Sequence, residues 1–181
     1  MINVNNINAY SVAGEATCIQ INHLNVAFDM GPSAHAVNIS NVFFTHPHID
    51  HLGSIVSHCA MRNLRGSSAP NYYIHKDLVE KVNNLFACWN KLDGSNLRYN
   101  LIPVDDTSVI KIKDFFIRPF NTTHRIPTLG YVIYKLAKKL LPEFKDLDPK
   151  QLGQLRKDKK VIETEEEIPL FAFCGDTTIN V

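Results

Sequence analysis

Short apolar runs alternate with polar turns along the first half of the chain, and this pattern predicts a sheet interleaved with helices. Four apolar runs are predicted strands, at 18–21, 25–28, 41–44 and 71–74. The run at 41–44 is almost continuously apolar, which is typical of a strand buried on both faces. Apolar residues recur at helical spacing in two further segments, which are predicted helices at 52–64 and 76–92.

The second half of the chain is predicted to be mainly strand. Its apolar runs lie at 101–104, 109–113, 115–120, 131–134 and 170–173. Strands and helices therefore alternate early and strands dominate later, which indicates a layered α/β protein and excludes a helix bundle or a pure β-sandwich. The length of 181 residues suits one domain.

Composition narrows the class of protein further. Apolar residues make up 45% and charged residues 20%, which are ordinary values for a globular chain. The formal net charge is +1, so a polyanionic partner has to be argued from a local patch. No apolar run is long enough to span a membrane, and the first ten residues lack the features of a secretory signal. We expect an intracellular, cytoplasmic protein whose cysteines are reduced and buried: Cys18, Cys59, Cys88 and Cys174.

Residues 135–168 differ from their surroundings in charge. Nine bases and four acids lie within 135–160, and an acidic cluster follows at 163–167. The segment is too polar to join a core and is interpreted as an insertion between two strands. Most charge runs of this kind are ordinary solvated surface, and that interpretation stays open. The alternative is an arm whose bases contact phosphates without regard to sequence.

The most informative pattern for chemistry is the motif His46-x-His48-x-Asp50-His51. Imidazole nitrogen and carboxylate oxygen are ligands of zinc and other divalent metals. With Pro47 between two histidines at i and i+2, the side chains cannot share one helical face and must project from a loop. Four ligands in six residues exceed what one catalytic zinc with an open position needs, so the motif favours two adjacent metals. A polar loop whose side chains bond one another is the competing interpretation.

Two metals require further ligands from elsewhere in the chain. His124 follows the predicted strand 115–120, and Asp176 follows the predicted strand 170–173. Loops at strand ends are common places for functional residues. Taken alone, however, His124 is as readily a surface residue and Asp176 a plain turn residue.

Together these residues resemble the metallo-β-lactamase superfamily and, within it, short-form ribonuclease Z. The resemblance runs from about residue 10 to residue 181. Besides the histidine motif it rests on four segments, 11–18, 24–31, 123–131 and 173–178. It implies a metallo-β-lactamase-type αβ/βα sandwich, of which this chain holds the first half and the opening of the second. It also implies a tRNA 3′-processing endoribonuclease with two zinc ions, acting on precursor tRNA as a homodimer.

The resemblance implies a role for each position. The zinc ligands would be His46, His48 and His124 at one ion, Asp50 and His51 at the other, with Asp176 shared by both. Asp50 would also be the catalytic proton acceptor. Asp29, in an Asp-x-Gly turn, would orient a ligand from behind, its alternative being a plain turn residue.

The resemblance also implies that the inserted segment 135–168 is a basic arm that binds tRNA, each arm serving the partner subunit. The candidate RNA-binding residues are Lys135, Lys138, Lys139, Arg156, Lys157, Lys159 and Lys160.

The sequence departs from the family pattern after residues 175–177. The family continues beyond this Gly-Asp-Thr segment and supplies there a final histidine ligand and a histidine that delivers a proton. We therefore expect residues 1–181 to form a single, incomplete domain with one complete and one partial zinc site, and with one face of the first sheet left uncovered. Weak or absent catalysis is expected for the isolated chain. Two alternatives remain: another phosphodiesterase or hydrolase of this fold, and a catalytically dead RNA-binding fragment.

Overall fold

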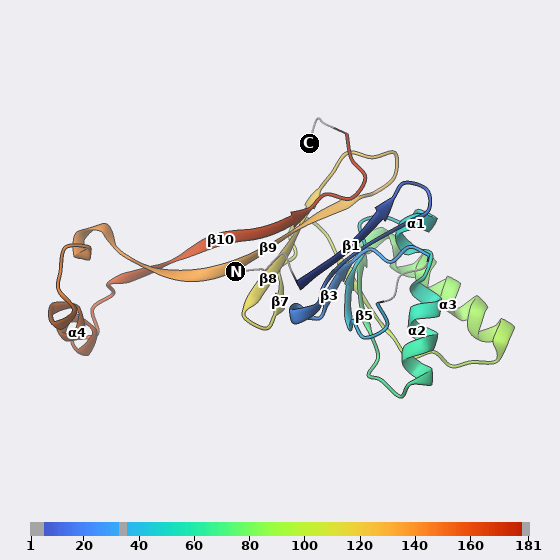
Figure 1. Ribbon diagram of the computed structural model, residues 1–181, viewed down its shortest axis with the longest axis horizontal. Coiled ribbons are helices and arrows are strands. Elements are labelled where there is room, and N and C mark those ends of the chain that lie inside the picture. Colours follow the sequence, from blue (N-terminus) through green and yellow to red (C-terminus); the bar gives the residue numbers. More distant parts are fainter. Residues whose placement is uncertain (1–5, 33–35, 179–181) are drawn as a thin grey trace.

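The computed structural model describes residues 6–32 and 36–178 and arranges them in layers with a long projecting arm (Figure 1). A six-stranded sheet has the order β1-β2-β3-β4-β5-β6, and a four-stranded sheet has the order β10-β9-β8-β7. Helices α1 to α3 lie on one face of the first sheet, and the second sheet packs on its other face. The predicted α/β class is confirmed.

The first sheet is mixed. Its strands are β1 (Ile7–Val12), β2 (Ala16–Ile21), β3 (Val26–Phe28), β4 (Asn41–Phe43), β5 (Asn71–His75) and β6 (Asn100–Val104). Strands β1 to β3 pair antiparallel, and β3 to β6 pair parallel. The connections carry the short η2 turn (Asn22–Leu24), α1 (Ile49–Leu52), α2 (Ile55–Leu64), the η3 turn (Lys76–Leu78) and α3 (Val79–Asp93).

The second sheet is antiparallel throughout. Its strands are β7 (Ile110–Ile112), β8 (Phe115–Asn121), β9 (Leu129–Leu140) and β10 (Glu163–Phe173). The outer half of the β9–β10 hairpin leaves the body of the molecule and ends in the η4 turn (Pro142–Phe144) and α4 (Pro149–Lys157). Asp148 begins α4 with a reciprocal capping box to Gln151, which satisfies free N–H groups at the helix start.

Alternation of side chains along the central strands creates two cores. In β4, Val42 faces the helices and packs in the core that contains Phe86, while Phe43 faces the second sheet and packs near Tyr131. The Phe43 ring stacks on Tyr73 with 4.1 Å between centroids. Both faces of the central strands are therefore covered, so the expectation that one face of the first sheet is left uncovered is wrong for these strands. Among the described strands of this sheet, only the edge strand β1 has most of its side chains exposed.

The structure extends two predicted strands into the charged segment. The apolar runs predict only 131–134 and 170–173, whereas β9 reaches Leu140 and β10 begins at Glu163. In this extension Glu165 lies opposite Lys138. Cross-strand pairs of opposite charge stabilise a ladder without any apolar core, so a hydrophobic pattern cannot detect it. Strand β1 is also absent from the prediction, because most of its side chains are exposed.

The cysteines only partly follow the expectation. Cys18 and Cys59 are buried, but Cys88 on α3 and Cys174 after β10 are exposed. The prediction of burial is wrong for these two, because apolar neighbours in sequence do not fix which face of a helix or strand a residue occupies. Among the residues described, no helix is long and apolar enough to cross a membrane.

The core between the helices and the first sheet holds a buried histidine. His58 on α2 is 1% exposed, with Nε2 3.2 Å from the Ala36 carbonyl oxygen and Nδ1 2.8 Å from the Tyr72 hydroxyl. A carbonyl only accepts, so the neutral ring donates from Nε2 to Ala36, while Nδ1 faces a Tyr72 hydroxyl that also contacts the Ile55 carbonyl oxygen at 3.2 Å. Burial, aided by the nearby Arg62 charge, lowers the pKa of His58 to about 4.

Acid is therefore expected to destabilise the fold through His58. The His58 ring takes up a proton near pH 6.5 in the unfolded chain, but only near its lowered pKa in the folded chain. The neutral ring therefore contributes its full share of the unfolding free energy above about pH 6.5, and this share is lost as the pH falls toward the folded pKa. Between about pH 7 and pH 4.5 the wild-type chain should lose about 2.5 kcal/mol more unfolding free energy than the variant His58→Gln. Denaturant unfolding of both proteins measures the difference, and equal losses would contradict the assignment.

Candidate metal centre

The histidine motif lies on the loop between β4 and α1, and the second sheet anchors this loop. The Tyr131 hydroxyl donates a hydrogen bond to the Phe44 carbonyl oxygen at 2.7 Å. The Leu129 N–H donates to the Thr45 carbonyl oxygen at 3.0 Å. Both bonds come from β9, so the second sheet fixes the loop backbone and holds its side chains in defined directions.

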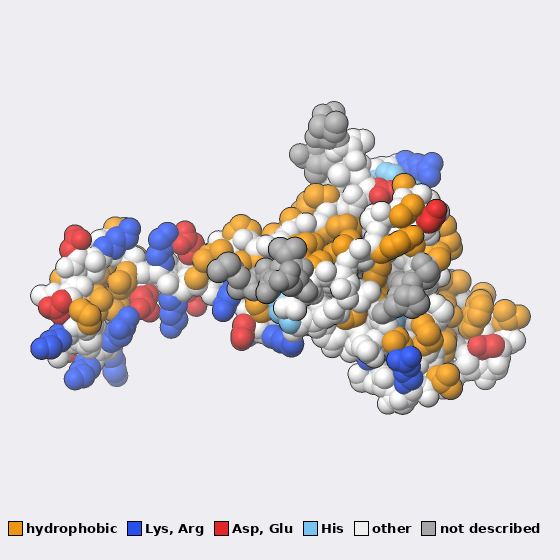
Figure 2. Space-filling view, viewed as in Figure 1, with side chains coloured by type: hydrophobic (Ala, Val, Ile, Leu, Met, Phe, Trp, Pro, Cys, Tyr) orange, Lys and Arg blue, Asp and Glu red, His pale blue; other side chains and the backbone are white. Residues whose placement is uncertain are grey.

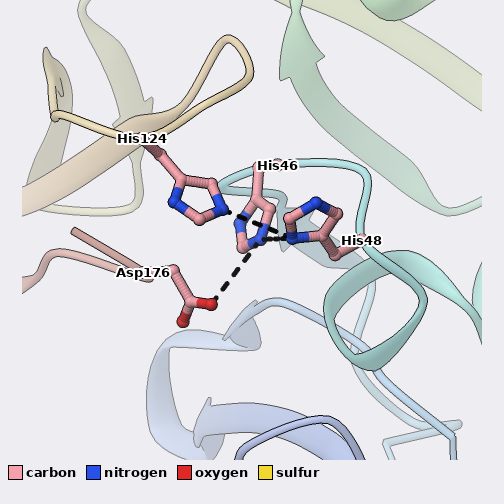
Figure 3. A group of neighbouring side chains, drawn as sticks. All are labelled: His46, His48, His124 and Asp176. Carbon is pink, nitrogen blue, oxygen red and sulfur yellow. Dashed lines mark hydrogen bonds and ion pairs between the residues drawn. The ribbon is translucent and has the colours of Figure 1, made fainter.

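Four side chains from three separate segments converge beside this loop (Figure 3). One donor atom from each of His46, His48, His124 and Asp176 lies within 4.8 Å of the others. His46 Nε2 is 2.9 Å from His48 Nδ1, which is 3.4 Å from His124 Nε2. Asp176 Oδ2 is 4.0 Å from His46 Nε2. Three imidazole nitrogens and a carboxylate oxygen aimed at one point are a donor set that fits zinc.

Asp50 and His51 lie beside the same aspartate. His51 Nε2 is 3.3 Å from Asp176 Oδ1 and 3.6 Å from Asp50 Oδ2. Asp176 thus turns one oxygen toward each group, as a carboxylate shared by two metals must. Within the described part of the chain this second group has only these three members, one fewer than the first.

The carboxylate of Asp29 is fully buried behind both groups. Its Oδ1 accepts a hydrogen bond from the Thr45 N–H at 2.7 Å, and its Oδ2 accepts from the Thr45 hydroxyl at 2.8 Å and from His51 Nδ1 at 2.7 Å. Its backbone has a φ of +57°, in the left-handed region that aspartate tolerates better than most residues. Asp29 therefore holds Thr45 and His51 in place and is not only a turn residue.

These hydrogen bonds decide which ring nitrogen carries each proton. The Thr45 hydroxyl donates to Asp29, so it accepts from His46 Nδ1 at 2.9 Å. His46 Nε2 is then left with its lone pair directed into the first group. His51 donates its Nδ1 proton to Asp29, which turns Nε2 toward the second group. A metal-binding imidazole needs this arrangement, so one carboxylate orients a ligand of each group.

Burial also keeps the first group in its metal-binding protonation state. It lowers the pKa of His46 to about 3, assisted by the neighbouring histidines. It lowers the pKa of His48 as well, together with the charge of Arg125. Burial by itself would lower the pKa of His51, but the hydrogen bond and charge of Asp29 outweigh it and raise that pKa. Neutral imidazoles are the form that binds metal, so burial favours metal binding at His46 and His48.

Asp50 is held by the backbone of a neighbouring loop. The Gly14 N–H donates to Asp50 Oδ2 at 2.9 Å. Burial tends to raise the pKa of Asp50, but this hydrogen bond and the adjacent His51 lower it below its usual value. The carboxylate is therefore ionised at neutral pH and can accept a proton.

Two glycines allow the backbone to approach the centre closely. A Cβ atom at Gly31 would run into the Asp50 carbonyl and lie 2.8 Å from the Ala16 Cα atom. Gly175 has a φ of +63°, and a Cβ atom there would lie 2.8 Å from the Thr45 side chain. The Asp-x-Gly and Gly-Asp patterns of the sequence thus mark close contacts that set the positions of Asp50 and Asp176.

The loops carrying His124 and Asp176 are joined to each other. The Thr123 N–H donates to the Thr177 hydroxyl at 3.2 Å, and the Thr178 N–H donates to the Thr123 carbonyl oxygen at 3.3 Å. The sequence does not predict a role for these threonines. The one sequence feature that marks them is their position: Thr45 and Thr123 directly precede a candidate histidine ligand, and Thr177 directly follows Asp176.

The residues predicted to bind RNA lie apart from this centre. Lys135, Lys138 and Lys139 are on β9, Arg156 and Lys157 are on α4, and Lys159 and Lys160 follow α4. Two of them have acidic partners within the arm. Lys139 Nζ is 2.8 Å from Glu166 Oε2, and Arg156 pairs with Glu163.

Known proteins are similar to this chain in sequence and in architecture. No family model matches the chain. It is 34% identical over 175 residues to tRNase Z TRZ1 of Arabidopsis thaliana, covering 95% of this chain and 62% of that protein. It is 32% identical over 152 residues to the nuclear ribonuclease Z of Triticum aestivum, covering 83% of this chain and 86% of that protein.

Two solved structures show the same fold. The short form of human tRNase Z matches with a TM-score of 0.52 and 16% identity, covering 72% of this chain and 63% of that one. The metallo-β-lactamase fold protein YhfI from Bacillus subtilis matches with a TM-score of 0.51 and 18% identity, covering 68% of this chain and 53% of that one.

The extent of these matches differs between relatives. The chain spans 62% of TRZ1 and 49% of the chloroplastic tRNase Z TRZ2 of Arabidopsis thaliana, to which it is 34% identical. It spans 86% of the wheat protein. With this coverage and identity, and with the fold and the grouped histidines in place, the chain belongs to the ribonuclease Z (tRNase Z) family of the metallo-β-lactamase fold.

Proposed function

We propose that this chain acts in tRNA 3′-end processing, as a zinc-dependent endoribonuclease that removes the 3′ trailer from precursor tRNA. The convergence of His46, His48 and His124 with Asp176, in a chain of this family, carries the proposal. The four free cysteines suit a reducing compartment, so we place the activity inside the cell, in the cytoplasm.

The donor set supports zinc at two adjacent positions. His46, His48, His124 and Asp176 would hold the first ion, and Asp50, His51 and Asp176 would hold the second. Bound zinc ions lower the pKa of water and offset negative charge on a phosphate. Asp50 would take the proton of the attacking water, since the Gly14 N–H keeps its carboxylate ionised.

The arm supplies contacts for a polyanion only at selected positions. Residues 135–168 contain nine bases and eight acids, and Figure 2 shows both signs intermixed on the arm. The acids of β10 engage Lys139 and Arg156. Five of the candidate bases have no acidic partner within 4.0 Å in the described ranges: Lys135, Lys138, Lys157, Lys159 and Lys160. Lys135 and Lys160 lie over the rings of Phe115 and Phe144, and Lys138 lies opposite Glu165. Lys157 and Lys159 have none of these contacts and are therefore the strongest candidates for phosphate contacts.

The position of the arm supports a homodimer. Strand β9 begins beside the loop that carries His124, and its far end lies in the arm, about 35 Å away at the usual rise of a strand. Figure 1 shows the tip of the arm on the side of the molecule away from β1 and α1. An arm that points away from its own metal centre is available to RNA held at the centre of a second copy.

The first expected outcome concerns zinc affinity. The described residues offer four donors to the first ion and three to the second, so calorimetric titration should give one tight and one weaker site. Asp29→Asn should weaken both sites by roughly 10- to 100-fold, because it removes the charge and replaces one acceptor oxygen by an N–H donor beside His51 and Thr45, which in turn contacts His46.

A second variant separates orientation from misfolding. Thr45→Val removes the hydroxyl that links His46 to Asp29 but leaves the hydrogen bond between His51 and Asp29 intact. It should therefore weaken zinc binding only at the first, tighter site. Circular dichroism checks that each variant is folded. Two equally tight sites in the wild-type chain, or equal losses at both sites in Thr45→Val, would contradict this account.

Cleavage of a precursor tRNA with a 3′ trailer tests the reaction. With added zinc, the chain should cut weakly but at the trailer junction, and Asp50→Ala should slow this cleavage by at least about 100-fold because the proton acceptor is lost. Asp77→Ala, at an exposed position, is the matched control. Hydrolysis of a bis-aryl phosphodiester without tRNA cleavage would instead support another phosphodiesterase. Salt-sensitive tRNA binding without any hydrolysis would support a catalytically dead RNA-binding fragment.

The double variant Lys157→Gln/Lys159→Gln tests the arm. It should weaken precursor-tRNA binding and reduce the slope of log affinity against log salt by about 2, since two phosphate contacts are lost. Lys81→Gln/Lys91→Gln on α3 removes the same charge elsewhere and should leave the slope unchanged.

Mixing two impaired variants tests whether the arm works in the partner subunit. The Asp50→Ala chain keeps its arm, and the Lys157→Gln/Lys159→Gln chain keeps its metal centre. If each arm serves the other subunit, the mixture should cleave precursor tRNA faster than the sum of the two variants measured alone. No recovery in a mixture that forms mixed dimers would contradict the exchange.

A further inference from the structure

The arm leaves the body of the molecule where the second sheet loses a strand. Strand β8 pairs with β9 from Asn121 back to Phe116, which lies opposite Tyr134. Beyond Tyr134, within the part of the chain that the structure describes, β9 pairs with β10 alone, so the arm continues as a two-stranded ribbon (Figure 1). Such a ribbon is marginally stable by itself and has little packing to hold it in one direction. The direction of the arm therefore has to be set at this exit.

A β-bulge lies at the same exit. Pro169 lies opposite Tyr134, and Phe171 lies opposite Ile133, so Leu170 is an extra residue of β10 without a partner. A bulge interrupts the ladder, bends its strand and increases the local twist. Pro169 also has no N–H to donate. The exit is therefore the place where the ribbon bends most readily relative to the body.

One arginine spans this exit. Arg118 on β8 lies opposite Val132, inside the three-stranded part of the sheet. Its guanidinium reaches Glu167, which lies opposite Leu136 in the two-stranded ribbon. Nη1 donates to Glu167 Oε2 at 3.1 Å, and Nη2 donates to Oε1 at 2.9 Å. Because a bidentate pair fixes the relative direction of its two groups, Arg118 links the body to the base of the arm across the bulge.

The ring of Tyr134 keeps the guanidinium in place. Arg118 Cζ lies 4.8 Å from the ring centroid, and Nη2 also donates to the Tyr134 hydroxyl at 3.2 Å. Tyr134 is 5% exposed and stacks on Phe116 with 5.4 Å between centroids. Exposed ion pairs contribute little when both side chains have to be ordered. Here the arginine is already held by a buried ring, so its pair with Glu167 loses less side-chain entropy.

We propose that Arg118 and Glu167 form a strut that sets the direction of the arm and thereby positions its bases. Five paired rows, from Glu167 to Glu163, separate this strut from the tip, which is about 15 Å at the usual rise of a strand. A small rotation at the base therefore displaces Lys157 and Lys159 much further. Under the proposed function, on which this step rests, an arm with a fixed direction loses less entropy when it binds RNA.

The distance between two spin labels on the full chain measures the direction of the arm. One label is attached to the exposed Cys88 on α3, and the other to Lys150→Cys on α4, while Cys174→Ser removes the other exposed thiol. Dilution with unlabelled chain restricts the signal to label pairs within one chain. Double electron–electron resonance should give a narrow distance distribution for this parent. Arg118→Gln or Glu167→Gln should make it at least about twice as wide, since the bulge is then free to bend.

Glu166→Gln is the matched control for the strut. Glu166 Oε2 is 2.8 Å from Lys139 Nζ, but both residues belong to the arm, so this ion pair does not span the bulge. The control should leave the distance distribution as narrow as in the parent. Arg118→Lys keeps the charge but loses the planar fork, so its width should fall between those of the parent and Arg118→Gln. Unchanged widths in Arg118→Gln and Glu167→Gln, or equal broadening in Glu166→Gln, would overturn the proposal.

Binding of precursor tRNA distinguishes positioning of the arm from direct contact with RNA. If Arg118 acts as a strut, Arg118→Lys and Glu167→Gln should both weaken binding, by roughly two- to fivefold relative to Glu166→Gln. In the Lys157→Gln/Lys159→Gln background the same changes should have little further effect, because the strut acts through those bases. If Arg118 contacted phosphate itself, Glu167→Gln would release it and strengthen binding. That result would overturn the positioning role.

The two measurements separate this proposal from the proposed function. Broader distributions in the strut variants would support the strut even in a chain that binds no precursor tRNA, in which case only the proposed function fails. Unchanged widths would overturn the strut even in a chain that cleaves precursor tRNA. In a chain that does cleave it, Glu167→Gln should raise the KM and leave kcat unchanged, because the metal centre lies at the other end of the β9–β10 hairpin.

Discussion

The Asp29 carboxylate is removed from solvent and accepts hydrogen bonds from Thr45 and His51. A buried charge of this kind is costly unless such donors surround it, so the loop after β4 and helix α1 are held where they supply those donors. His46 and His51 lie at the ends of this network, and their Nε2 atoms face the metal centre. The stability of the loop and the readiness of the centre for metal thus depend on the same few bonds.

The layered architecture explains why this network is reached from so many segments. Parallel strands β3 and β4 end side by side, which brings Asp29 next to the histidine loop. The second sheet then contributes the loops before β9 and after β10, which carry His124 and Asp176. The β9–β10 hairpin therefore links the metal centre at one end to the arm at the other.

Sequence alone predicted the central elements and the grouping of candidate ligands, because apolar periodicity and ligand chemistry are both local features. The motif at 46–51 needed no fold to be recognised. The connection of His124 and Asp176 to it came from a family resemblance, since residues 76 or more positions apart are joined only by the packing of two sheets. The charged extensions of β9 and β10 could not be predicted from apolar pattern, because pairs such as Lys138 and Glu165 replace a core there.

Anomalous diffraction from crystals of the zinc-loaded chain, recorded at the zinc absorption edge, tests directly whether the network around Asp29 prepares a metal centre. The account predicts zinc held by Nε2 of His46, Nδ1 of His48, Nε2 of His124 and an oxygen of Asp176, with the Thr45–Asp29 bond retained. Zinc bound elsewhere, or bound to Nδ1 of His46 with the Thr45 contact broken, would contradict it.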